Sequence, residues 1–353
     1  MTMQEDVKEV RKLQLVGGST FALSLPKKWV DEMDLQTGDP VYIIKNVNNS
    51  LSLFPTGGLT SRTIRSRAII TQKDSMESIR RKIIAMYLAG YRTIEIKNKG
   101  NRIQPNQKQV IRDLVRKNMI GTEIVESSSE SVTIQVLTSL PQLSISDSLK
   151  RMSLLASTMH RDSIEALKQK NTDLAEEVIC LDDEVDRFSL YILRNLVLAV
   201  EHESILHDIG LQKGSDCISF RVVVKCVERI ADHAVSIAKR VKDLKSSLEP
   251  EILQKISKLS EESLKVFEDS ITALNKRDYS IADIVATDAC KIAEKEKEFT
   301  DSLEESKKYS SLVKFVLEDI RRTAEYSSDI AEAVMNETIQ DVISEDHIES
   351  IQS

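Results

Sequence analysis

From residue 141 to its end, the sequence contains six long segments with helical periodicity and no alternating pattern of the kind that strands show. Short breaks marked by Gly, Pro, Asn or Ser separate the segments. Long amphipathic helices can bury their apolar stripes only against one another, so this half of the chain is predicted to be a helical bundle. The predicted helices span residues 147–170, 173–207, 216–245, 250–275, 278–306 and 309–338.

The third and sixth of these helices carry similar acidic motifs. Ala-Asp-His-Ala follows Glu228, and Ser-Asp-Ile-Ala follows Glu325. A motif that recurs after three helices indicates two three-helix repeats. The fold class is therefore predicted as mainly α, with two three-helix-bundle repeats preceded by a small β domain and a small α/β domain.

Three pairs of carboxylates lie four residues apart within the predicted helices. Such residues are neighbours on a helix surface, so each like-charged pair destabilises its helix by a few tenths of a kcal/mol unless a cation lies between the two groups. Apolar residues share the helix face of the first pair, and a buried carboxylate is costly unless it is paired or binds a metal. If the helices of the first two pairs pack antiparallel, four carboxylates can converge on one cation. The pairs are Asp182 with Asp186, Glu228 with Asp232, and Glu325 with Asp329.

The alternative for each pair is an ordinary solvated helix face. This alternative fits the third pair best, because the residues at helical spacing around Glu325 are mostly charged or polar. If metal binds, ligation by carboxylates alone favours magnesium, manganese or iron, with zinc as a further candidate. The four cysteines are widely spaced and form no CxxC motif, so a thiolate zinc site is not expected.

Residues 1–59 form the first predicted domain. Within it, residues 11–55 show the order strand, strand, helix, strand, strand. A unit of this size has too little core to be stable alone, so we expect it to form a homodimer. If it also binds DNA, basic side chains would contact phosphates, which position a protein without reading the sequence. The candidates for these contacts are Arg11, Lys12, Lys27 and Lys28.

Residues 60–140 alternate strands with helices and are predicted to form a small α/β domain, which leaves 141–353 as the helical domain. The formal charges of the three domains are −1, +8 and −14, which add up to the −7 of the chain. This separation indicates partners of opposite charge, although a solvated basic face is an alternative for the middle domain. The sequence has no run of eighteen apolar residues and no signal segment, so we expect a cytoplasmic protein without membrane insertion.

The first domain resembles the AbrB/SpoVT swapped-hairpin family. The resemblance rests on Leu-Pro-Lys-Lys at the start of the predicted helix and on LQTGDPV at residues 35–41. It implies a dimer in which two chains interlace their hairpins, and a surface that commonly binds DNA. Dimerisation without DNA binding is the alternative, because the strands before the helix lack a string of basic residues.

The helical domain resembles the PhoU family of phosphate uptake regulators. The resemblance is carried by DLAEEVICLDDEVDRFSLYI at residues 173–192 and ERIADHAVSIAKRV at residues 228–241. It implies two repeated three-helix bundles, multinuclear metal binding by the paired acidic motifs, and repression of phosphate uptake. The implied partners are the ATPase of the phosphate ABC transporter or its signalling kinase. An AbrB-like domain joined to a PhoU-like region further resembles archaeal members of the family.

The same resemblance divides the acidic residues into a complete site and an incomplete one. Asp182, Asp186, Glu228 and Asp232 match the metal motif of the first repeat, and Glu325 and Asp329 match half of the second. Aligning IADIVATDACKIAEKE with LAEEVICLDDEVDRFS places Ala289 and Ala293 opposite Asp182 and Asp186. Asp288 and Glu294 are nearby and are candidate substitutes.

We therefore expect a regulatory protein without enzymatic activity, which binds metal and acts as an adaptor in phosphate uptake and signalling. A DNA-binding role in transcriptional regulation is a further expectation for the first domain. The alternative from another class is a carboxylate-ligated metalloenzyme in a helical bundle. Such sites typically use a Glu-x-x-His motif, which this sequence lacks, and no nucleophile with its base is evident.

Overall fold

A computed structural model describes residues 9–45, 50–55, 65–99, 102–137, 144–201, 203–244, 247–306 and 311–343. The chain divides into two compact units, Met1–Thr63 and Ile64–Ser353. The predicted domain boundaries after residues 59 and 140 lie outside the described residues. The three-domain division therefore stays a prediction.

The first unit has the predicted order of two strands, one helix and two strands. Two antiparallel hairpins form separate two-stranded sheets, and a positive φ at Gly17 and Gly18 allows the tight turn of the first hairpin. Neither hairpin buries its apolar face within the unit, since Phe21 is 68% and Ile43 is 66% exposed. The elements are β1 (Gln14–Val16), β2 (Thr20–Ala22), α1 (Lys27–Glu32), β3 (Val41–Lys45) and β4 (Leu51–Pro55).

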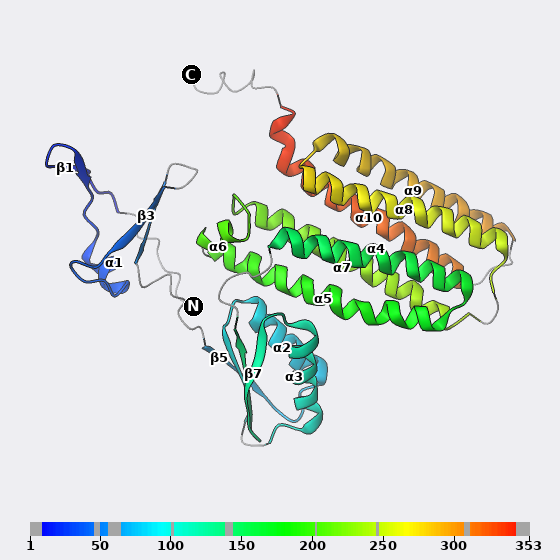
Figure 1. Cartoon of the computed structure of the whole chain (residues 1–353), viewed down its shortest axis with the longest axis horizontal. Helices are drawn as coiled ribbons and strands as arrows, with labels where there is room; N and C mark the ends of the chain where they lie inside the picture. The colour runs from blue at the N-terminus through cyan, green and yellow to red at the C-terminus, as the bar shows by residue number, and fades with distance from the viewer. Residues whose placement is uncertain are drawn as a thin grey trace. The chain divides into compact units, whose positions relative to one another are not determined.

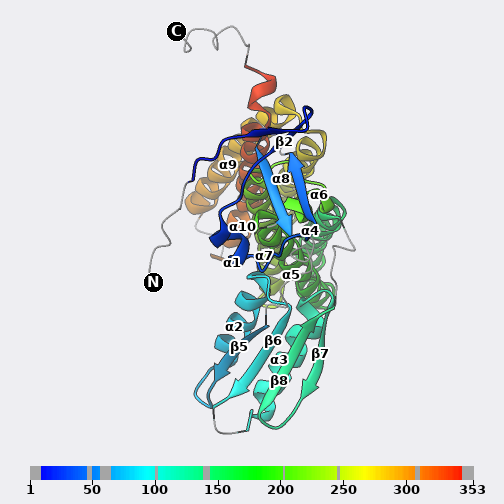
Figure 2. The same cartoon turned by 90° about the vertical axis from the view of Figure 1, so that its left-hand side faces the viewer.

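The second unit begins with a four-stranded sheet that carries two helices on one face (Figure 2). The strand order is β5-β6-β8-β7, with β5 and β6 parallel and the other neighbours antiparallel. Ile79 and Ile83 of the first helix and Ile111 of the second are fully buried against Ile94 and its neighbours. The elements are β5 (Arg65–Ile70), α2 (Met76–Leu88), β6 (Thr93–Asn98), α3 (Pro105–Asn118), β7 (Thr122–Ser127) and β8 (Ser131–Val136).

Six long helices follow, as predicted. They make two sets of three, and the helices within each set contact one another pairwise (Figure 1). The predicted second helix is shorter than expected, because a separate short helix, α6, follows it. The elements are α4 (Ile145–Gln169), α5 (Thr172–Glu201), α6 (Glu203–Asp208), α7 (Asp216–Val241), α8 (Pro250–Lys276), α9 (Tyr279–Ser306), α10 (Ser311–Thr338) and the 3₁₀ helix η1 (Ile339–Asp341).

The helix boundaries follow local sequence. The side chain of Ser144 accepts a hydrogen bond from Asp147 N at 2.9 Å and caps α4, while Asn171 Oδ1 accepts from the backbone at the start of α5. Lys170 and Arg277 end α4 and α8 in the left-handed conformation. No helix among the described residues has an apolar stretch long enough to cross a membrane.

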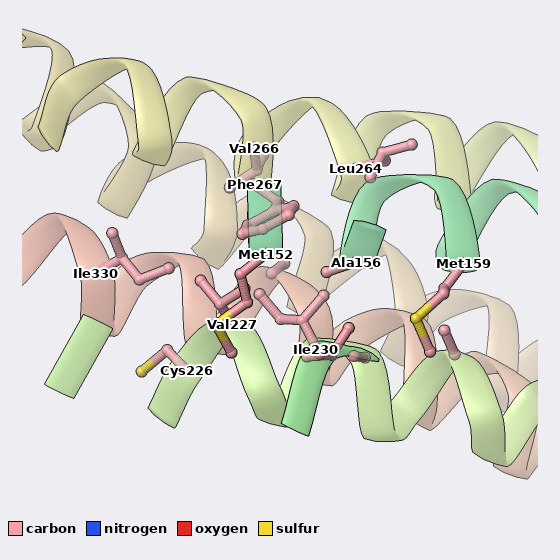
Figure 3. Close-up of a cluster of buried hydrophobic side chains, with 14 of the residues drawn as sticks. Met152, Ala156, Met159, Cys226, Val227, Ile230, Leu264, Val266, Phe267 and Ile330 are labelled. Carbon is pink, nitrogen blue, oxygen red and sulfur yellow. The ribbon is translucent and has the colours of Figure 1, made fainter. Parts of the chain in front are cut away.

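The two sets of helices share one hydrophobic core. Met152 and Met159 of α4 meet Val227 and Ile230 of α7 and Phe267 of α8 in this core (Figure 3). Burying a large apolar side chain contributes about 1.5–3 kcal/mol, so this shared core binds the two sets together.

The four-stranded sheet with α2 and α3, called the sheet domain below, packs against α5 through these two helices. The buried guanidinium of Arg194 donates to the backbone carbonyl of Gly90 at 3.0 Å and to that of Tyr87, which satisfies carbonyls at the end of α2. At Gly90 the φ is +86°, and an added Cβ would lie 2.9 Å from Leu198 Cδ2. A glycine is therefore needed where the end of α2 approaches α5.

Candidate metal centre

The first acidic cluster is defined by two carboxylates on α5 and two on α7, which pack against each other. Its members are Asp182, Asp186, Glu228 and Asp232. Val178 and Val185 of α5 and Val224 of α7 are fully buried, and their burial fixes the rotation of both helices. As a result, three of the carboxylate residues are partly buried at the edge of the core, and Asp232 is the most exposed of the four but still partly shielded from water.

These four carboxylates act on one another electrostatically. Burial raises the pKa of Asp182 to about 6, and the negative charge of Asp232 adds to the effect. Burial raises the pKa of Asp186 to about 7, with contributions from the other three carboxylates. Burial and the neighbouring Glu228 also raise the pKa of Asp232. Lys239 and Lys225 act in the opposite direction on Asp182 and Asp186, and a bound cation would offset the repulsion further.

Two side chains hold Glu228 in place. Ser189 Oγ of α5 donates to Glu228 Oε2 at 2.5 Å, and Lys225 Nζ pairs with Oε1 of the same carboxylate. Among the described residues, no group of three or more His, Cys, Asp or Glu side chains is close enough to hold a metal ion. Convergence of the four carboxylates on one cation therefore stays a prediction, and it would require these side chains to turn toward one another. The donor set itself consists of oxygens, which suits a hard cation.

The second acidic cluster, defined as Glu325 and Asp329 of α10 with Glu296 of α9, contains its own cation. Arg321 Nη1 donates to Glu325 Oε1, and Arg321 Nε lies 3.5 Å from Glu296 Oε2. Arg322 Nη1 donates to the other oxygen of Glu325 at 3.0 Å. Both oxygens of Glu325 are therefore engaged by guanidinium groups.

Asp329 is held differently from Glu325. The Cys226 thiol of α7 donates to Asp329 Oδ2 at a sulfur-to-oxygen distance of 3.9 Å, which places Asp329 against α7. Burial raises the pKa of Asp329 and the nearby Glu325 adds to the effect, while the charge of Arg229 lowers it. The structure therefore does not bring the two predicted ligands of this pair to a common partner.

Helix α9, which packs against α10, lacks carboxylates at the two positions that match Asp182 and Asp186. These positions are occupied by Ala289, which is buried, and Ala293. The candidate substitutes are directed elsewhere, since Asp288 pairs with Lys291 at 2.8 Å and Glu294 is exposed. Glu296 of α9 does reach α10, where its Oε2 lies 3.5 Å from Arg321 Nε.

Sequence reasoning missed Arg321, Glu296 and Ser189. The alignment that paired Ala289 with Asp182 also places Glu296 opposite Ser189. In the first cluster, the Ser189 hydroxyl donates a hydrogen bond to Glu228. In the second, the Glu296 carboxylate lies beside Arg321. Arg321 precedes Glu325 by four residues, where the matching residue before Glu228 is the apolar Val224. Both signals were present in the sequence.

The candidate DNA-contacting residues are all exposed on the first unit. Arg11 and Lys12 precede β1, and Arg11 pairs with Glu9. Lys27 and Lys28 lie in the first turn of α1, where Lys28 lies 3.9 Å from Glu32. All four side chains are accessible to phosphate, although Arg11 and Lys28 also form ion pairs within the chain.

The family comparisons separate the two parts of the chain. Residues 149–241 match the profile of the PhoU domain, and residues 14–58 match that of the antidote-toxin recognition MazE, bacterial antitoxin. The chain is 27% identical over 131 residues to a phosphate-specific transport system accessory protein PhoU homolog from Clostridium acetobutylicum. This alignment covers 36% of the chain and 58% of the relative, so the chain spans less than two thirds of that relative's length.

Two solved structures resemble the chain. The phosphate transport system regulatory protein PhoU from Streptococcus pneumoniae has a TM-score of 0.47 and 20% identity, over 57% of this chain and 96% of that chain. PhoU from Pseudomonas aeruginosa has a TM-score of 0.49 and 21% identity, over 56% of this chain and 96% of that chain.

Proposed function

Because this chain carries a PhoU domain and a MazE/AbrB-like segment N-terminal to it, we propose that it is a metal-binding regulator of phosphate transport. The PhoU domain belongs to a regulatory, non-enzymatic family. In this proposal the protein acts in the cytoplasm as an adaptor to the ATPase of the phosphate transporter or to its signalling kinase. The two repeated three-helix bundles would form the adaptor.

The observation that carries the metal part of the proposal is the electrostatics of the first cluster. Three of its four carboxylates have raised pKa values, and the paired Lys225 side chain is 39% exposed. A magnesium, manganese or iron ion would supply the missing positive charge, and zinc is a further candidate. The bound ion would hold α5 and α7 together, since each helix contributes two ligands.

The N-terminal segment supports a homodimer within the same proposal. Large apolar side chains on both hairpins are exposed, and a swapped arrangement with a second chain would bury them. DNA binding through Arg11, Lys12, Lys27 and Lys28 is the finer proposal for this unit. DNA affinity that falls steeply with added salt would support it, and dimerisation without DNA binding would leave the adaptor role alone.

Phosphate uptake in the organism that encodes this protein tests the regulatory role. Deleting the gene is expected to raise uptake under phosphate-rich conditions, and the intact gene should restore repression. A gene with Asp182→Asn and Asp186→Asn should fail to restore it. The matched control changes Asp173→Asn and Glu177→Gln, an exposed pair with the same spacing on the same helix, and should restore repression. Uptake that does not respond to deletion would refute the proposed function.

A further inference from the structure

A cavity of about 250 Å³ lies at one end of the helical bundle. The starts of α4 and α7 and the ends of α8 and α10 meet at this end (Figure 1). The volume corresponds to roughly eight water molecules at ~30 Å³ each, enough for a small organic molecule. The cavity contains none of the residues of either acidic cluster, and the proposed function uses only the first cluster.

The walls of this cavity combine four apolar side chains with polar and charged ones. Leu149, Leu211 and Leu274 are all more than 90% buried, and Phe220 covers a further side. The rim is held in shape by Asp216, whose Oδ2 accepts the backbone N–H groups of Gln212 and Lys213 at 3.0 Å each. The cavity is therefore formed by fixed elements of the bundle, as binding sites for small molecules commonly are.

One acidic side chain in the lining lacks a full set of partners. Glu337 of α10 has a side chain only 11% exposed, and its Oε1 has no hydrogen-bond partner among the described residues. Its other oxygen, Oε2, accepts from Arg277 Nη2 at the long distance of 3.4 Å. A buried carboxylate oxygen without a donor is costly, so a ligand that donates to it would bind favourably.

The charge around this carboxylate favours a cationic donor. Burial raises the pKa of Glu337 and the negative charge of Asp216 adds to the effect, while the Ser219 hydroxyl and Arg277 lower it. Arg277 lies at the mouth with a half-exposed side chain, so water screens its charge. The lining thus combines a buried acid, Asp216, and a largely covered acid, Glu337, with one screened base.

We propose that this cavity binds a small ligand with an ammonium group on an apolar body. The ammonium would donate to Glu337 Oε1, and the apolar body would fill the space between Leu149, Leu211 and Leu274. A simple aliphatic amine and an apolar α-amino acid share this chemistry. The carboxylate of an amino acid would face Arg277 at the mouth, which distinguishes the second source from the first.

Calorimetric titration of the full-length protein tests the proposal with three probes of similar shape. These are isopentylamine, L-leucine and 4-methylpentanoate. We expect the amine or the amino acid to bind, and Glu337→Gln to weaken that binding at least tenfold. Tighter binding of L-leucine identifies the amino-acid class, and tighter binding of isopentylamine identifies the amine class. The acid, which lacks an ammonium group, is not expected to bind.

Two further variants test whether binding occurs in this cavity. Leu274→Phe adds volume to the cavity wall and should abolish binding while Glu337 is intact. Glu332→Gln, an exposed acid on the same helix, should leave binding unchanged. The proposal is overturned if neither ammonium probe binds, if 4-methylpentanoate binds as well as they do, or if binding survives Glu337→Gln. Failure here leaves the regulatory function untouched, because the two rest on different residues.

Discussion

The two acidic clusters differ in where their positive charge comes from. In the first, Asp182, Asp186 and Asp232 have raised pKa values, and the nearest paired cation is the lysine beside Glu228. In the second, Arg321 lies between Glu296 and Glu325 and neutralises them from within the chain. A shared acidic motif therefore does not give a shared site. The clusters differ in which carboxylates the cation reaches, since Lys225 pairs with Glu228 of its own helix, whereas Arg321 contacts carboxylates of two helices.

The two clusters therefore make opposite demands on an added metal ion. The first would gain from an external cation, because Lys225 and Lys239 offset only part of its repulsion and the pKa values of Asp182 and Asp186 stay raised. The second would have to exchange an existing guanidinium for a metal, which offers little net gain. We expect one resident metal centre in this chain, at α5 and α7.

The largest expected effect comes from removing two ligands of the first cluster. Asp182→Asn with Asp186→Asn should lower metal affinity by on the order of a thousandfold, about 4 kcal/mol, as measured by calorimetric titration. The same variant should raise the melting temperature of the metal-free protein, because two repelling charges are gone. Asp173→Asn with Glu177→Gln serves as the control for metal affinity and should leave that affinity unchanged. Metal affinity that is equal in the two double variants would contradict the assignment.

A smaller effect is expected at the contact between the helix sets that carry the two clusters. His160 of α4 is fully buried, and its Nε2 lies 2.9 Å from Ser260 Oγ of α8. Burial, Arg161 and His233 lower its pKa to about 4, with Ser260 and Asp319 acting in the opposite direction. Below the unfolded pKa of about 6.5, the unfolded state binds the proton more readily than the folded state.

Stability should therefore fall as the pH drops from about 6.5 to about 4, by up to about 3 kcal/mol, and this group should add no further loss below that range. Urea unfolding of wild type and His160→Gln across this range measures the difference. The variant should show a shallower loss toward acid, with one cooperative transition for the whole bundle. Parallel pH profiles for the two proteins would show that His160 does not titrate as the structure indicates.

The smallest effect concerns the internal cation of the second cluster. Arg321→Gln should destabilise the metal-free protein by about 1–2 kcal/mol, because it leaves Glu296 and Glu325 without their shared partner. The neighbouring Arg322→Gln is the matched control. Its side chain is 41% exposed against 23% for Arg321, so a loss below about 1 kcal/mol is expected. Urea unfolding that ranks the two variants in the reverse order would remove the distinction between the clusters.

Periodicity predicted most of the fold because helix patterns are local. The expected helix at 250–275 is observed as Pro250–Lys276. The predicted alternation of strands and helices is also confirmed for residues 65–136, which form β5, α2, β6, α3, β7 and β8 in order. Local pattern could not predict that the sheet domain packs on α5. That contact depends on Arg194 reaching carbonyls more than a hundred residues away, which no periodicity encodes.

The candidate site was predictable to the extent that it depends on one helix at a time. The apolar neighbours of Asp182 predicted a buried stripe on its helix face, and their burial is confirmed, while Asp182 itself is only partly buried. The neutralisation of Glu325 was missed, because it combines a residue one turn earlier with Glu296 from another helix. Sequence spacing describes neighbours on one helix, whereas the charge balance of a site depends on the side chains that several helices bring together.

The most direct measurement is a crystal structure of the protein grown with manganese, with data collected at the manganese absorption edge. We expect an anomalous peak bound by Asp182, Asp186, Glu228 and Asp232, and no peak at Glu325 and Asp329. A peak at the second cluster with none at the first, or no peak at either, would contradict this expectation.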